Sequence, residues 1–126
     1  MIIFNKKLIE VTTDKYKDMA SIILKEAEKS PEDAAKILSS YKDEEIKNII
    51  SKMHLQKAAI ILLQMDTIHL ARIFLLFEKV ALAGGYIFNI SRIPGGRKKA
   101  EDILKAYGMD TDYSETWKEL KARSYL

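Results

Sequence analysis

Ala34-Ala-Lys-Ile-Leu-Ser-Ser-Tyr41 is repeated in pattern by Ile46-Lys-Asn-Ile-Ile-Ser-Lys-Met53, by Ala58-Ala-Ile-Ile-Leu-Leu-Gln-Met65 and by Leu70-Ala-Arg-Ile-Phe-Leu-Leu-Phe77. The four segments follow one another at intervals of twelve residues without a gap. Isoleucine occupies the fourth position of each, and methionine or an aromatic residue occupies the eighth. A fixed period found by self-comparison usually reports a repeated structural unit. This stretch therefore decides the fold.

The twelve-residue period is informative because it does not fit one long helix. Within a segment, positions one, four, five and eight share one face of an α-helix. Twelve residues turn a helix by about 1200°, which is about 120° beyond a whole number of turns. In one unbroken helix the apolar face would wind around the whole cylinder, whereas a surface helix carries a single apolar stripe. We therefore predict a mainly α fold of four stacked short helices, each redirected at a link.

The links between the segments carry most of the expected helix-start signals. Ser30-Pro31-Glu32-Asp33 places an N-cap serine, a proline at the first helical position and acids in the first turn. Acids also precede the second segment at Asp43-Glu44-Glu45, and Asp66 offers a cap before the fourth. The third link, His54-Leu55-Gln56-Lys57, has no such signal. The second and third helices could therefore be joined there.

Residues 31–77 resemble the helical repeats of one superfamily. Units of this kind at this spacing are similar to the N-terminal cytoplasmic domain of MgtE-type magnesium transporters, the middle domain of the flagellar rotor protein FliG and the motor-associated MotE proteins. The resemblance implies a right-handed superhelix that serves as an interaction or regulatory module, and it does not extend to transport. An ordinary compact bundle is the alternative.

The N-terminal flank and the end of the fourth repeat give further predictions. Residues 1–11 are expected to form a strand, a small hairpin or an arm. A first helix is expected from Asp14 to Lys29. The fourth repeat helix is expected to run on to Ala83 and to stop at Gly84-Gly85, because glycine ends helices readily.

The C-terminal flank begins with residues 86–90, an apolar run that could be a strand paired with residues 1–11 or a buried turn. After a loop, helices are expected over Arg97–Tyr107 and over Asp112–Arg123, the second starting at a capping-box-like sequence. The whole chain 1–126 is expected to be one domain: an N-terminal strand or arm (1–11), a helical repeat core (12–85) and a C-terminal loop with two helices (86–126). Trp117 and Leu120 would anchor the last helix.

The sharpest local signal is a basic, glycine-rich segment at residues 92–108. It resembles the second half of a helix-hairpin-helix DNA-binding motif, in which a glycine turn presents helix N-terminal amides to a backbone phosphate. A helix N-terminus attracts anions, and nearby cations strengthen that field. An ordinary glycine-rich helix entry with solvated lysines is the alternative. The candidate contacts to phosphate or nucleic acid are Arg92, Gly95, Gly96, Arg97, Lys98 and Lys99.

A second candidate site is the row of soft and aromatic side chains in the repeats. The row is interpreted first as core, but an open superhelix would let part of it line a groove for a partner helix. The candidate groove residues are Tyr41, Met53, Met65, Phe74 and Phe77.

Composition excludes several classes of protein. The chain has 126 residues, no cysteine and a net charge of +3, so thiol chemistry and thiolate zinc sites are excluded and a cytoplasmic location is favoured. No stretch approaches the roughly 20 apolar residues of a membrane span. His54 and His69 are interpreted as surface or capping residues. We expect no enzyme, metal or cofactor, but a protein partner or a homo-oligomer, with nucleic acid as the alternative partner.

Overall fold

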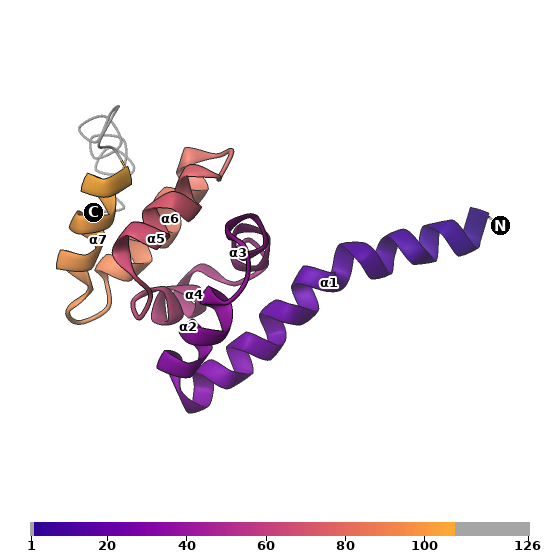
Figure 1. The fold of residues 1–126 in the computed structure, drawn as a ribbon, viewed down its shortest axis with the longest axis horizontal. Coiled ribbons are helices and arrows are strands. Elements are labelled where there is room, and N and C mark those ends of the chain that lie inside the picture. Colours follow the sequence, from indigo (N-terminus) through magenta and orange to yellow (C-terminus); the bar gives the residue numbers. More distant parts are fainter. Residues whose placement is uncertain (1, 108–126) are drawn as a thin grey trace.

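The chain between residues 2 and 107 folds into short helices that pack on one another and one long helix that extends beyond them (Figure 1). The computed structural model describes residues 2–107, with side chains from residue 15 onward. Helices joined by short links make up the described part, which contains no strand, and this confirms the predicted mainly α class. The helices are α1 (Ile2–Lys29), α2 (Pro31–Ser39), α3 (Asp43–Ile50), α4 (Leu55–Leu62), α5 (Thr67–Leu75), α6 (Val80–Ser91) and α7 (Gly96–Tyr107).

The N-caps of α2 to α5 repeat the period of the sequence. They are Ser30, Lys42, His54 and Asp66, each twelve residues after the last. Ser30 Oγ accepts a hydrogen bond from the Asp33 amide at 3.2 Å. The side chains of Ser30, His54 and Asp66 satisfy amides that the helix itself leaves without a partner, whereas Lys42 makes no side-chain cap. The chain is thus redirected at every link, as the period requires.

The third link corrects the prediction that α3 and α4 could be joined. Ser51 caps the end of α3, and α4 starts only after His54. The His54 side chain accepts from the Gln56 amide at 3.3 Å, through Nδ1. The histidine ring therefore caps α4, as the side chains of Ser30 and Asp66 cap α2 and α5.

The short helices stack by a simple rule: each of α2 to α5 packs against the helix two places further along the chain. These pairs are α2 with α4, α3 with α5, α4 with α6, and α5 with α7. The last part of α1 packs on α2, α3 and α4. Two-turn helices are unstable alone in water, so this mutual packing is what holds them.

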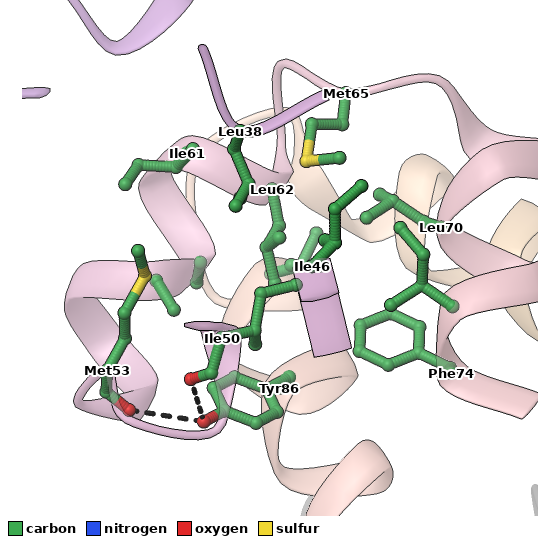
Figure 2. Close-up of a cluster of buried hydrophobic side chains, with 14 of the residues drawn as sticks. Leu38, Ile46, Ile50, Met53, Ile61, Leu62, Met65, Leu70, Phe74 and Tyr86 are labelled. Carbon is green, nitrogen blue, oxygen red and sulfur yellow. Dashed lines mark hydrogen bonds between the residues drawn. The ribbon is translucent and has the colours of Figure 1, made fainter. Parts of the chain in front are cut away.

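The repeat positions form the centre of the core. Every position one, four, five and eight of the four segments is buried, except Ile37 and Tyr41. Tyr86 of α6 enters the same core, where its ring lies 6.4 Å from that of Phe74 and 5.9 Å from that of Phe77 (Figure 2). The prediction that these four positions share one face of each helix is therefore confirmed.

Neither of the two β alternatives is present in the described residues. Residues 2–11 belong to α1, and residues 86–90 belong to α6. No glycine or proline interrupts positions 2–29, and Ile2, Ile9, Tyr16 and Ile23 recur every seven residues, which suits a helix. The run at 86–90 is short and apolar, a pattern that cannot distinguish a strand from a buried helix.

The predicted boundary at Gly84-Gly85 is also wrong. The fourth repeat helix, α5, ends at Leu75, and the two glycines lie buried inside α6. A Cβ added at Gly85 would lie 3.4 Å from Leu55 of α4. That is an ordinary contact distance, so the space beside Leu55 does not itself require glycine, and the pair does not end a helix here. The helix predicted at Asp112–Arg123, with Trp117 and Leu120, lies outside the described residues.

Candidate interaction surfaces

The basic segment forms a tight turn from α6 into α7. Arg92 is the C-cap of α6, Gly95 has a φ of 81°, and α7 begins at Gly96. A Cβ at Gly96 would lie 1.9 Å from the Ile90 carbonyl oxygen, which no side chain tolerates. Both glycines are thus required by the turn itself, one for its conformation and one for its closeness to α6. Their presence does not need a phosphate to explain it.

Two of the cations in this turn are paired along α7. Arg97 Nε lies 3.5 Å from Glu101 Oε1, and Lys98 Nζ lies 3.1 Å from Asp102 Oδ1. Such exposed pairs one helical turn apart are weak, so both cations could exchange their partners for a phosphate. The two acids nevertheless reduce the positive field at the N-terminus of α7.

Lys99 and Arg92 make contacts within the protein. Lys99 is half-buried, and its Nζ donates a hydrogen bond to the Met65 carbonyl oxygen at the end of the third repeat segment. Burial lowers the pKa of Lys99, while the charges of Asp66 and Asp102 act in the opposite direction. The Arg92 guanidinium lies 5.7 Å from the centre of the Phe88 ring. Of the four predicted cations, Lys99 is thus a structural contact between α7 and the α4–α5 link.

The predicted partner row lies inside the molecule. Met53, Met65, Phe74 and Phe77 are buried, and Tyr41 is half-buried. Figure 2 shows Met53, Met65 and Phe74 among the other core side chains. These residues therefore lie in the core, which was the first of the two interpretations of the row. A partner would reach only Tyr41 without opening the fold.

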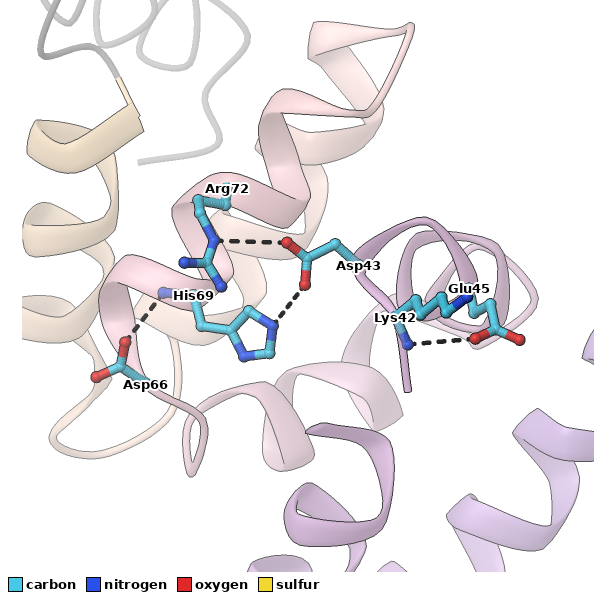
Figure 3. Close-up of polar contacts among 6 residues, drawn as sticks. All are labelled: Lys42, Asp43, Glu45, Asp66, His69 and Arg72. Carbon is cyan, nitrogen blue, oxygen red and sulfur yellow. Dashed lines mark hydrogen bonds and ion pairs between the residues drawn. The ribbon is translucent and has the colours of Figure 1, made fainter. Parts of the chain in front are cut away.

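A polar cluster joins α3 to α5 (Figure 3). Asp43 Oδ1 lies 2.8 Å from His69 Nε2, and Asp43 Oδ2 lies 3.4 Å from Arg72 Nε. Asp66 Oδ2 accepts from the His69 amide at 3.0 Å, which orients the start of α5. The sequence does not reveal this cluster, because nothing in it places positions 43 and 69 together. No group of three or more potential metal ligands occurs among the described residues.

Apolar side chains also line hollows on the outer surface of α1, α4 and α6. Ile60 of α4 is 46% exposed and lines both of them. One, of about 160 Å³, lies against Leu24 and Ala27 of α1. The other, of about 470 Å³, lies against Phe88 and Ile93. The sequence shows that the helix around Ile60 is apolar nearly all round, but it does not show which residues of α1 and α6 lie beside it.

A further exposed apolar group lies where α5 passes into α6. Its four side chains fall between positions 75 and 82 of the chain. Leu75 is the most accessible of them, at 57% exposure. The four are Leu75, Leu76, Val80 and Leu82.

Within residues 2–107, none of the helices combines the length and the apolar character needed to cross a bilayer. Comparison with protein-family models, with curated proteins and with solved structures found no match. The resemblance to the MgtE, FliG and MotE repeats stays a prediction.

Proposed function

We propose that this chain is a non-catalytic protein–protein interaction module that associates with copies of itself. The observation that carries the proposal is the position of α1. From Tyr16 onward this helix packs on the core, through Met19, Ala20 and Ile23. Its first half lies clear of the other described helices and extends away from them (Figure 1).

The sequence of that first half suits contact with another helix. Six of its residues are apolar, and Ile2 and Ile9 continue at seven-residue spacing the positions of Tyr16 and Ile23. A short helix without a partner is only marginally stable in water. The positions that pack on the core in the second half of α1 would therefore need cover from another chain in the first half. The apolar residues are Ile2, Ile3, Phe4, Leu8, Ile9 and Val11.

The order of charges within residues 2–14 of α1 supports a second copy as the partner. Lys6 and Lys7 come first, and Glu10 and Asp14 follow. Two copies in antiparallel orientation would bring the basic part of each helix beside the acidic part of the other. Such a contact is symmetric, which is the commonest arrangement in homodimers.

Light scattering coupled to gel filtration tests the proposal on the full chain. The protein should shift from monomer to dimer as its concentration rises. Ile9→Asp should abolish the shift, because the substitution places an unpaired carboxylate within the contact. Ile3→Asp is the matched control: the same chemical change, one position off the seven-residue series. A strictly monomeric wild-type protein at every concentration would remove the proposal.

Nucleic-acid binding through the turn between α6 and α7 is the weaker alternative. Arg97 and Lys98 are exposed there, which favours it, but Glu101 and Asp102 pair with them. A gel-shift series against salt distinguishes the two functions, because affinity based on phosphate contacts falls steeply as salt rises. Absence of binding at low salt would exclude this alternative and leave the first proposal intact.

A further inference from the structure

The two hollows beside Ile60 adjoin each other, because this one side chain lines both of them. Its helix, α4, packs against both α1 and α6. Ile60 therefore separates the hollows as a ridge that is 46% exposed. Leu24 and Ala27 line the first hollow from α1, and Phe88 and Ile93 line the second from α6 and the turn after it. We call this surface, the two hollows with Ile60 between them, the Ile60 groove.

The form of the Ile60 groove suits the side chains of a helix. It consists of two separate hollows, of about 160 and 470 Å³, on either side of one residue. Side chains three or four residues apart on a helix are about 5–6 Å from each other, so one can enter each hollow with Ile60 between them. Helices pack on one another in this way, with the ridges of one in the grooves of the other. Apolar anchors at this spacing are typical of a helix bound in a groove.

The charged side chains of the groove favour an acidic partner. Lys57 lines the first hollow and Arg92 the second, so each hollow has one cation, against the single acid Glu28 among the described lining residues. Within residues 15–107, neither cation forms an ion pair. Carboxylates on a partner would complement these two cations, whereas a basic partner would be repelled. Residues 2–14 of a second copy carry two lysines and two acids, and so lack the required excess of acid.

We propose that the Ile60 groove binds an acidic amphipathic helix of another protein. One apolar side chain of that helix enters the hollow on each side of Ile60, and its carboxylates lie opposite Lys57 and Arg92. The lining residues all belong to positions 24–93, so the site does not include the first half of α1 and does not depend on self-association. A dimer formed through α1 would carry two such grooves and bridge two partner molecules.

A synthetic peptide is the probe for this site. It is a fluorescein-labelled helix of about four turns, with leucines at positions i, i+4, i+7 and i+11 and glutamates beside them. Fluorescence anisotropy should show saturable binding to the full-length protein. Ile60→Asp should weaken this binding about tenfold or more, because it places a carboxylate between the two apolar anchors. Ile68→Asp is the matched control: the same change at an α5 residue that is 65% exposed and lines neither hollow should leave binding unchanged.

Charge reversal tests the acidic character of the partner. A second peptide keeps the leucines and has lysine in place of every glutamate. It should bind the wild-type protein about tenfold more weakly than the acidic peptide does, and Lys57→Glu combined with Arg92→Glu should reverse this order. Both positions are exposed, so the double variant should keep its helices, which circular dichroism checks.

Four results would overturn the inference. They are no saturable binding of the acidic peptide, an affinity that Ile60→Asp leaves unchanged, equal affinity for the acidic and basic peptides, and loss of binding in Ile9→Asp. The last of these would place the peptide at the α1 contact. Because Ile9→Asp is expected to remove self-association and to keep peptide binding, failure of this inference is distinguishable from failure of the proposed function.

Discussion

The Tyr86 hydroxyl of α6 donates a hydrogen bond to the Ile50 carbonyl oxygen of α3 at 2.7 Å, and the Met53 carbonyl oxygen lies 3.1 Å from the same hydroxyl. Ile50 is the last residue of α3 and Met53 lies in the link that follows it, where backbone carbonyls have no amide donor within the helix. A single buried phenol of α6 therefore provides a hydrogen-bond donor at the end of α3, a helix that lies far from α6 in the sequence. The contact shows how the stacked helices depend on one another.

Tyr86→Phe should lower the free energy of unfolding by about 1–3 kcal/mol, because it removes the phenolic donor that two buried carbonyl oxygens share while keeping the ring. Urea unfolding measures the change. Tyr41→Phe makes the same substitution at a half-buried ring, where we expect a change within about 0.5 kcal/mol. Equal losses in the two variants would show that the hydroxyl of Tyr86 contributes nothing specific.

Alkaline pH should destabilise the protein through the same residue. Burial raises the pKa of Tyr86 from 10.0 to about 12. Between these values the unfolded chain loses the phenol proton and the folded chain keeps it, so stability falls as pH rises. The fall should reach about 2–3 kcal/mol at the upper end of that interval. Tyr86→Phe should remove this component from the pH dependence of urea unfolding, and an unchanged slope would contradict the assignment.

The lowered pKa of Lys99 acts with the opposite sign. Its folded form releases a proton at lower pH than the unfolded chain does, so this residue adds stability as pH rises toward its ordinary value of 10.5. The difference between wild type and Tyr86→Phe isolates the tyrosine, because Lys99 is present in both proteins.

The two glycines of the α6–α7 turn should differ in their response to alanine. Gly96→Ala should cost about 3 kcal/mol or more, because its Cβ would overlap the Ile90 carbonyl oxygen. The Cβ of Gly95→Ala would contact no atom, so the substitution should lower the free energy of unfolding only through the strain of a positive φ, by about 1–2 kcal/mol. Thermal unfolding of the pair measures both. If Gly95→Ala proved the more damaging, the close approach of α7 to α6 would be wrong.

The polar link from α3 to α5 should contribute modestly to stability. Asp43→Ala removes contacts to both His69 and Arg72, and about 0.5–1.5 kcal/mol of the free energy of unfolding should go with them. Glu44→Ala, which loses only a contact to Lys47 within α3, is the control. Its expected cost is below about 0.5 kcal/mol. A cost for Glu44→Ala equal to that for Asp43→Ala would show that the link is unimportant.

The sequence predicted those features that depend on local pattern. The twelve-residue period predicted separate helices, and Ser30 and Asp66 predicted where α2 and α5 start. Both features depend only on residues that are neighbours in the sequence. The prediction at Gly84-Gly85 was wrong because tertiary packing can override the usual preference of glycine, and both residues lie buried within α6. The contacts of Tyr86, His69 and Lys99 could not be predicted, since each joins residues that only the folded chain brings together.

Cysteine cross-linking tests the central claim, self-association through the first half of α1, most directly. The chain has no cysteine, so an introduced one is unique. Under mild oxidation, Ile9→Cys should form a covalent dimer much faster than Ile3→Cys does, because position 9 lies on the face that a second copy would cover. No dimer from either variant, or equal rates from both, would contradict the account.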